Sequence, residues 1–364
     1  MLNFAIVGCG RIANKIVDGI ISNSKKAKLV AICDILKDKM DQIEKRYIEK
    51  TNIKNEIVKN SNYKELLGKV KVDVVIVSTE SGYHEEIGLY FLENRVNVII
   101  EKPIAMSIQG AQKLVDKAKE KKLKLAACHQ NRFNYPIQLL KKAIQENRLG
   151  KIFNGMARIL WTRDDNYYLQ APWRGTWALD GGTLMNQCIH NIDLINWMMD
   201  DEIDTVYAQT SNYIRNIEAE DYGVILIRYK SGKIATIEGS AIVYPKNLEE
   251  TLTVTGEKGT VVIGGMAVNK INTWRVEGDN EQEYLSIDCG DPNSVYGYGH
   301  EALYKDFIDA LDENREPLVN GIAGLEAVKI ILAAYKSQKT GSAIKFDEFK
   351  EFSTLDMKNI NLRG

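Results

Sequence analysis

Short apolar runs alternate with amphipathic segments over the first third of the chain. The apolar runs predict five strands, at residues 3–7, 28–33, 72–78, 96–100 and 124–128. Helical patterns lie between them, and Ser107 is the expected N-cap of a helix over 107–121. Apolar strands that alternate with helices are typical of a parallel sheet covered on both faces. We therefore predict a doubly wound α/β domain over residues 1–124.

The pattern changes after Gly150, where longer segments alternate apolar and polar positions and are rich in β-branched and aromatic residues. These segments predict strands at 151–162, 206–214, 222–229, 234–243, 251–255 and 260–263. One helix is expected at 182–199, and two more near 301–311 and 324–336. We predict an α+β domain over residues 125–364 with an open, mainly antiparallel sheet. Its terminal helices can pack back on the first domain.

Composition narrows the class of protein. A length of 364 residues suits two domains, and a net charge of −1 shows no bias toward nucleic acid or anionic membranes. The five cysteines are scattered without a C-x-x-C pair, and the four histidines have no ligand-like spacing, so we expect neither a disulfide framework nor a metal site. The chain start has no signal-peptide pattern and no apolar run approaches about 18 residues. We expect a cytoplasmic protein with no membrane or nucleic-acid partner.

A glycine-rich turn follows the first strand and opens a helix. Gly8, Gly10, Arg11 and Ile12 belong to a G-x-G-x-x-A run, which permits close approach of a pyrophosphate to a helix N-terminus. Asp34 ends the second strand at about the expected offset of 20 residues, where its carboxylate can bind both ribose hydroxyls and repel a 2′-phosphate. The alternative is that Asp34 caps the next helix. The pattern predicts a Rossmann domain that binds NAD rather than NADP, with Ser78 and Thr79 at the ligand edge of the sheet.

A lysine follows the fourth strand at the same edge. Glu101 and Lys102 precede Pro103, which biases Lys102 away from helical geometry. We expect both residues to contact the cofactor, and the Lys102 ammonium to stabilise negative charge on a substrate oxygen. The alternative is a strand-end ion pair of Glu101. We interpret His84, just inside a helix, as a solvated histidine.

A third segment combines Trp173-Arg-Gly-Thr-Trp177 with Gly181-Gly182, Asn186 and His190. A helix that begins at Gly182 would place Asn186 and His190 on one face, one turn apart. His190 has a suitable ordinary pKa to accept a hydroxyl proton as hydride leaves, and Asn186 would orient the hydroxyl or the imidazole. The alternative is a buried helix with a core histidine.

These motifs together resemble the Gfo/Idh/MocA oxidoreductases over nearly the whole chain. The resemblance rests on the segments Gly8–Ala13, Asp34, Glu101–Pro103 and Gly181-Gly182 with His190-x-x-Asp193. It implies a Rossmann domain, an open-sheet domain, a homodimer or homotetramer, and catalytic positions at Lys102 and His190. Many members carry Asp four residues before the histidine, where this chain has Asn186.

Within that family, the chain is more similar to UDP-N-acetylglucosaminuronate 3-dehydrogenases of the WlbA type. The shared segments are Trp161–Arg163, Trp173–Trp177, Met185–Gln187, Arg215–Glu218, Tyr244–Leu248, Gly256–Gly259 and Ser294–Gly297. This similarity implies oxidation of a sugar 3-hydroxyl to a 3-keto intermediate for surface-polysaccharide synthesis.

Several side chains suit such a substrate. Arg163, Arg174 and Lys246 can pair with the carboxylate and diphosphate of a nucleotide sugar acid. Tyr167, Tyr168 and Trp173 can pack on its rings or form an oligomer contact, and Gln187 belongs to the shared segment at Asn186. The alternatives are a dehydrogenase or keto-reductase of free cyclitols or other sugars, and a non-catalytic NAD-binding sensor. A sensor does not need a base beside a lysine, which argues against the last.

Overall fold

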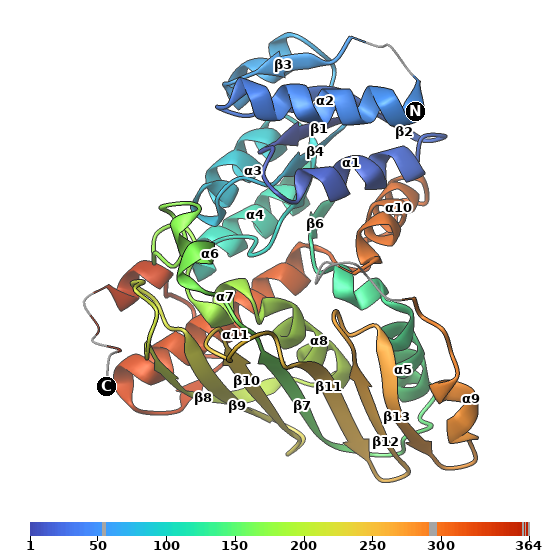
Figure 1. The fold of residues 1–364 in the computed structure, drawn as a ribbon, viewed down its shortest axis with the longest axis vertical. Helices are drawn as coiled ribbons and strands as arrows, with labels where there is room; N and C mark the ends of the chain where they lie inside the picture. Colours follow the sequence, from blue (N-terminus) through green and yellow to red (C-terminus); the bar gives the residue numbers. More distant parts are fainter. Residues whose placement is uncertain (53–55, 291–296, 359, 361, 363–364) are drawn as a thin grey trace. The chain divides into compact units, whose positions relative to one another are not determined.

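The computed structural model describes residues 1–52, 56–290, 297–358, 360 and 362. The chain forms two compact units (Figure 1). The first comprises Met1–Cys128 and His300–Leu325, and the second comprises His129–Gly299 and Glu326–Gly364. Ser294, Val295 and Tyr296, which belong to one segment of the family resemblance, lie outside the described residues.

The first unit contains a six-stranded parallel sheet with strand order β3-β2-β1-β4-β5-β6. Its strands are β1 Leu2–Val7, β2 Ala27–Cys33, β3 Val58–Asn60, β4 Val74–Val77, β5 Asn97–Ile100 and β6 Leu125–Ala127. Successive strands are added toward one edge of the sheet from β1 to β3 and toward the other edge from β4 to β6, so the strand order switches between β1 and β4. Ligands of doubly wound sheets bind at such a switch point. The predicted doubly wound fold is confirmed, although β3 was not among the predicted strands.

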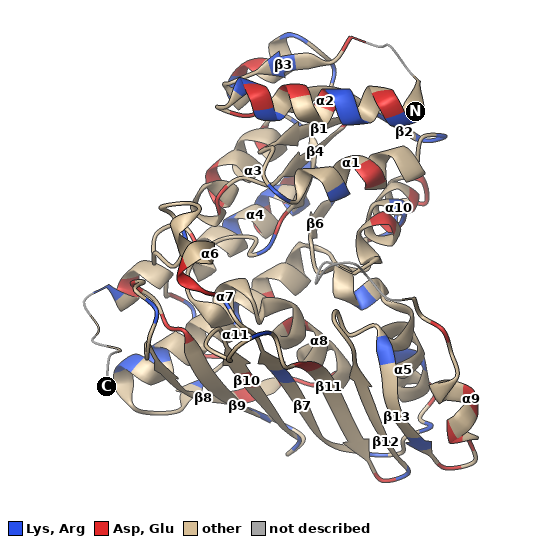
Figure 2. Cartoon of the chain, viewed as in Figure 1, with Lys and Arg blue, Asp and Glu red and all other residues tan. Residues whose placement is uncertain are grey.

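Helices connect these strands. They are α1 Ala13–Ser22, α2 Lys37–Thr51, α3 His84–Glu93 and α4 Ile108–Lys121, with 3₁₀ turns η1 Tyr63–Gly68 and η2 Ser81–Tyr83. Ser107 caps α4 as predicted, because its hydroxyl accepts from the Gly110 N–H at 2.9 Å. Figure 2 shows acidic and basic residues interspersed along α2, a pattern typical of a solvated helix face.

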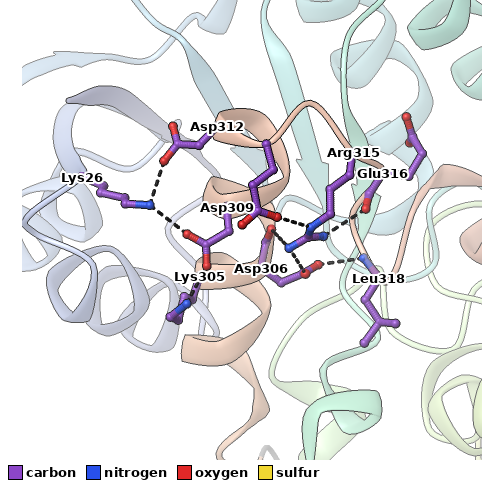
Figure 3. Close-up of polar contacts among 9 residues, drawn as sticks. Lys26, Lys305, Asp306, Asp309, Asp312, Arg315, Glu316 and Leu318 are labelled. Carbon is purple, nitrogen blue, oxygen red and sulfur yellow. Dashed lines mark hydrogen bonds and ion pairs between the residues drawn. The ribbon is translucent and has the colours of Figure 1, made fainter.

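A late segment of the chain returns to the first unit through α10 Gly299–Asp312. Lys26 binds Asp309 at 2.9 Å and Asp312 at 2.8 Å (Figure 3). Tyr304, which is fully buried, occupies the space left by Gly19, where a Cβ would lie 2.1 Å from the tyrosine ring. The buried packing of the Tyr304 ring and the exposed ion pairs of Lys26 therefore both hold α10 against the rest of the first unit.

The second unit contains an eight-stranded sheet with strand order β13-β12-β11-β7-β10-β9-β8-β14. Its strands are β7 Ile152–Leu160, β8 Ile203–Ser211, β9 Tyr222–Tyr229, β10 Ile234–Ser240, β11 Glu249–Gly256, β12 Gly259–Gly264, β13 Lys270–Val276 and β14 Ile344–Lys345. Among the described strands of this second sheet, only the β7–β10 pair is parallel, so the predicted open and mainly antiparallel sheet is confirmed. The pattern did not predict β13 or β14.

The remaining helices are α5 Tyr135–Gln145, α6 Asp165–Leu169, α7 Thr183–Asn186, α8 Ile189–Met199, α9 Glu281–Leu285 and α11 Gly321–Thr340, with 3₁₀ turns η3 Gln130–Phe133 and η4 Thr354–Met357. The single helix expected at 182–199 was wrong, because α7 ends at Asn186 and α8 begins at Ile189. Between them the Cys188 N–H donates to the Thr183 carbonyl at 3.0 Å, one residue further back than in an α-helix. Within the described parts of the chain, every helix is too short or too polar to cross a membrane.

Candidate active site

The glycine loop between β1 and α1 requires glycine at its first position. Gly8 has φ 98°, and a Cβ there would lie 2.5 Å from the Ser78 carbonyl group at the end of β4. A Cβ at Gly10 would meet no atom of the described protein within 4 Å, so the loop leaves open space at its second glycine. This is the cradle that a pyrophosphate needs at the N-terminus of α1.

Asp34 braces the same loop. One carboxylate oxygen accepts from the Cys9 N–H at 2.7 Å, and the other accepts from the Leu36 N–H at 2.8 Å. The N-cap of α2 is Leu36, so Asp34 orders the turn before the helix and is not its N-cap. Each carboxylate oxygen can accept a second hydrogen bond. Asp34 therefore has capacity for the two ribose hydroxyls of a dinucleotide while it supports the loop that would bind the pyrophosphate.

His84 was wrongly interpreted as a solvated histidine. Its side chain is 1% exposed. The ring nitrogen Nδ1 lies 2.7 Å from the Pro103 carbonyl oxygen, and Nε2 lies 3.1 Å from the Thr79 carbonyl oxygen. Burial lowers the pKa of His84, although the backbone carbonyls oppose this shift. The imidazole thus links the end of β4 to the residue that follows Lys102, and neither segment was predicted to contact it.

Glu101 and Lys102 follow β5. Ser78 directly follows β4, the neighbouring strand, and its hydroxyl donates to the Gly8 carbonyl at 2.8 Å. Lys102 is half-buried, whereas the Glu101 carboxyl is buried, and burial raises its pKa. The Cys128 side chain is hydrogen-bonded to the Glu101 carboxyl, and His300 Nε2 lies 4.0 Å from Glu101 Oε1. Cofactor contacts by Ser78, Thr79, Glu101 and Lys102 stay predictions.

The Glu101 side chain belongs to a buried cluster that sequence reasoning missed. Its other members are Cys128, His300 and Tyr304, and burial lowers the pKa of His300 to about 3. His300 and Tyr304 arrive from α10, about 200 residues after Glu101, so local patterns give no sign of this cluster.

In the second unit, a buried carboxylate holds Asn186. Asp180 is 2% exposed, and its Oδ2 accepts from the Gly175 N–H at 2.7 Å. Its Oδ1 accepts from the Asn186 side-chain amide. Asp180 was not a predicted site residue. Its position directly before Gly181-Gly182 was the available signal.

His190 is the second residue of α8 and is partly exposed. Its ring packs edge-on against the His129 ring, with centroids 5.7 Å apart. Asn186 and His190 were expected on one continuous helix, and the break between α7 and α8 corrects that expectation. Asp193 in the same motif is structural, because it forms a buried two-point ion pair with Arg132, at 2.6 and 2.8 Å.

Arginine and aromatic side chains gather near α6. The Arg163 guanidinium lies 5.3 Å from the Tyr167 ring centroid and 4.6 Å from that of Trp161. The Arg174 guanidinium lies 4.0 Å from the Tyr167 centroid and 5.2 Å from that of Trp173. Its Nε and Nη1 are buried and have no acceptor among the residues that the structure describes.

Some of the other expected substrate residues join the cluster near α6, and others do not. Gln187 Nε2 donates to the Tyr167 hydroxyl at 3.4 Å, and the Tyr168 ring packs edge-on against Tyr167 at 5.1 Å, so both join this cluster. Lys246 lies exposed in the loop after β10. Trp177 is a core residue that packs on Tyr335 at 5.1 Å. Arg215, which was noted only in a shared segment, also has a buried Nε without an acceptor in the described chain.

Comparisons with known proteins cover both units. The family model described as an oxidoreductase family with an NAD-binding Rossmann fold matches residues 2–129, and the GFO/IDH/MocA C-terminal domain matches 137–262. The chain is similar to the WlbA dehydrogenase of Bordetella pertussis, solved with NADH and UDP-GlcNAcA, at 32% identity and a TM-score of 0.83 over 94% of this chain and 98% of that one. The corresponding dehydrogenase of Chromobacterium violaceum, solved with the same ligands, gives 33% identity and a TM-score of 0.84 over 94% and 95%. The myo-inositol 2-dehydrogenase of Thermotoga maritima is 25% identical over 95% of this chain and 99% of its own length.

Proposed function

The chain belongs to the Gfo/Idh/MocA family of NAD-dependent oxidoreductases, and we propose that it oxidises the 3-hydroxyl of a UDP-N-acetylglucosaminuronate-like nucleotide sugar. The product would be a 3-keto sugar for surface-polysaccharide synthesis. The similarity to the two WlbA dehydrogenases supports this substrate over a free cyclitol, because identity to the inositol dehydrogenases is only 22–26%.

One observation carries the proposal. Arg174 buries Nε and Nη1 with no acceptor in the described chain, and it shares the Tyr167 ring with Arg163. A buried N–H of a charged group without a partner costs roughly 1–3 kcal/mol or more. A carboxylate or diphosphate would satisfy these donors, whereas a neutral cyclitol carries no anion to offer them.

The chemistry requires a hydride and a proton to leave the same CH–OH group. When bound, NAD accepts the hydride. We assign acceptance of the hydroxyl proton to His190 and stabilisation of negative charge on the substrate oxygen to Lys102. We assign orientation of the substrate to Asn186. The first unit supplies the glycine cradle and Asp34 for the dinucleotide.

We further propose a homo-oligomer formed through the sheet of the second unit. Met156, Leu226 and Tyr207 form one row with Thr236 across β7, β10, β9 and β8. Met156 is 45% exposed and Leu226 43%. Figure 2 shows scattered charged residues along these strands. Arg158 and Glu238, two positions along on the same face, pair with each other at 3.0 Å. An exposed apolar row of this kind is suited to pack against a second copy.

The substrate is tested by following NADH formation with UDP-N-acetylglucosaminuronate, UDP-N-acetylglucosamine and myo-inositol in parallel. A 2-keto acid acceptor is included in a second series, because a tightly held cofactor would hide net NADH formation. We expect turnover with the nucleotide sugar acid and weaker turnover with the sugar that lacks the carboxylate. Turnover of inositol without turnover of either nucleotide sugar would overturn the proposal.

A further inference from the structure

We propose that Asp180 is a positioning residue that fixes the side-chain amide of Asn186 in one orientation. This inference rests on the proposed function, which places Asn186 at the substrate. Asp180 itself is not assigned any contact with the substrate. It acts through Asn186 and through the backbone that carries Arg174.

The orientation follows from hydrogen-bond chemistry. The Asp180 carboxylate accepts from the Gly175 N–H through Oδ2 and from the Asn186 Nδ2 through Oδ1. A carboxylate only accepts, so the amide must turn its NH₂ group toward Asp180. The Asn186 carbonyl oxygen is therefore directed away from Asp180. The amide presents an acceptor on that side, the group that binds a sugar hydroxyl or an N–H.

Asp180 is itself firmly placed. Its own N–H donates to the Thr176 carbonyl at 3.1 Å, and the Gly181 N–H donates to the same carbonyl at 2.9 Å. Gly175, which Asp180 also binds, has φ 70°, and a Cβ there would lie 2.6 Å from the Ile217 side chain. The carboxylate thus joins a closely packed backbone turn, next to Arg174, to the last residue of α7.

The same geometry explains why this chain has an amide at position 186. An aspartate there would bring a second carboxylate within hydrogen-bond distance of the buried Asp180. Two carboxylates at that separation cannot both ionise, and they would share one proton. With Asp180 present, an amide gives position 186 a donor toward Asp180 and an acceptor on its other side, whereas a carboxylate offers no donor.

The test exchanges the two groups. In D180N an amide at position 180 lies opposite the Asn186 amide, and in N186D a carboxylate at position 186 lies opposite the Asp180 carboxylate. We expect each substitution to lower kcat/KM for the nucleotide sugar at least tenfold. The double variant D180N/N186D restores one amide and one carboxylate, and the amide carbonyl introduced by D180N can still accept from the Gly175 N–H. We expect the double variant to be at least tenfold more active than the weaker single variant. Asp204→Asn is the matched control, because Asp204 lies on β8 and its carboxylate pairs only with Lys345 among the described ion pairs. Its kcat/KM should equal that of the wild type.

Two further readouts separate positioning from simple structural damage. The kcat-against-pH profile of N186D should gain an apparent pKa from the shared proton, and the exchange variant should lose it again. Thermal unfolding of the NAD-bound proteins needs no substrate, and the two substitutions should be strongly non-additive in Tm. If wild-type protein does not oxidise the nucleotide sugar, the proposed function fails while the Tm cycle still tests the Asp180–Asn186 pair.

Additive Tm changes together with an N186D profile identical to that of wild type would overturn the role of Asp180. If D180N cannot be obtained folded, N186D and the exchange variant decide the matter. An exchange variant no better than N186D in kcat/KM and Tm would also overturn it.

Discussion

At the scale of single residues, Arg174 offers the sharpest test of the anionic substrate. Its guanidinium stacks on Tyr167 and buries two nitrogen atoms without acceptors in the described chain. We expect Arg174→Ala to raise KM for the nucleotide sugar roughly 10- to 100-fold, because a hydrogen bond to a charged group is worth about 1.5–3 kcal/mol. Arg174→Lys should restore little, since an ammonium lacks the planar fork.

Steady-state kinetics with the nucleotide sugar measure this effect. Arg275→Ala is the control, because the Arg275 side chain is largely exposed on β13. An unchanged KM in both Arg174 variants would show that the buried nitrogens do not contact substrate.

Lys102 and His190 are the residues assigned to the chemical step. We expect Lys102→Ala and His190→Ala each to lower kcat by at least roughly 100-fold, the usual loss when a general acid–base group is removed. Binding of NAD, measured by calorimetry, should stay within a few fold of wild type. Lys113→Ala, on the exposed face of α4, serves as control. Full activity in the double variant Lys102→Ala/His190→Ala would refute the assignment.

At the scale of elements, the sequence predicts what local patterns encode. Buried parallel strands are continuous apolar runs, so five of the six strands in the first unit were predicted within a few residues. The exception, β3, contains only Val58–Asn60 and lies at the edge of the sheet, where the pattern is short and partly polar. The two-residue strand β14 is likewise too short to carry a pattern.

The break between α7 and α8 was not predictable from local pattern. No glycine or proline interrupts residues 183–199, so the segment reads as one helix. In the fold, the Leu184 N–H donates to the Glu220 carboxyl at 2.8 Å, and a Cβ at Gly182 would collide with that carboxyl. Glu220 comes 36 residues after Leu184. Glu220 thus binds an N–H in the first turn of α7, and the break at Gln187 and Cys188 follows one turn later.

His84 was wrongly interpreted as solvated because its partners, too, lie in other segments of the chain. Its substitution tests whether the imidazole supports the turn that carries Lys102. Its ring bonds to carbonyls of two other segments, one of which directly follows Lys102. We expect His84→Ala to lower kcat about fivefold, because loss of about 1 kcal/mol of hydrogen bonding would loosen the turn that carries Lys102. His84→Asn keeps a donor and should recover part of the loss.

The comparison is made at saturating NAD, with Tyr83→Ala as control because Tyr83 is exposed beside His84. An unchanged kcat in His84→Ala would mean that the turn keeps Lys102 in place without the imidazole.

At the scale of the whole molecule, the change in pattern near Gly150 predicts two domains and leaves the packing of the terminal helices on the first domain only as a possibility, whereas residues 300–325 belong to the first unit. That return depends on two contacts between segments nearly 300 residues apart. Tyr304 fits against Gly19, and Lys26 pairs with Asp309 on α10 (Figure 3). Sequence order alone does not encode such a connection.

The proposed homo-oligomer has its own test. We expect Leu226→Glu to shift the protein toward monomer in light scattering after size-exclusion chromatography, because a charge in the Met156–Leu226–Tyr207 row must be desolvated on association. Leu355→Glu, on exposed η4, is the control. A wild-type protein that elutes as a monomer, or a Leu226→Glu variant with unchanged mass, would contradict the sheet interface.

Buried carboxyls give the protein a predictable dependence of stability on pH. Burial raises the pKa of Glu220 and of Glu250 to about 8, from an ordinary value of 4.5. Between these values the native state holds protons that the unfolded state has lost. The stability that these groups contribute is therefore complete below about 4.5 and is lost as pH rises through 8. From pH 6 to 9, we expect the free energy of unfolding to fall by about 3 kcal/mol for each group.

Glu220→Gln should flatten this fall, because a neutral amide occupies the site at every pH. Its carbonyl can still accept from the Leu184 N–H and from the Tyr335 hydroxyl, which the Glu220 carboxyl does at 2.8 and 3.0 Å. Urea unfolding at several pH values measures the slope, and Glu202→Gln, an exposed carboxyl paired with Lys230, is the control. A slope for Glu220→Gln equal to that of wild type would mean that Glu220 is already ionised in the native protein, so the hydrogen bonds from Leu184 and Tyr335 would outweigh its burial.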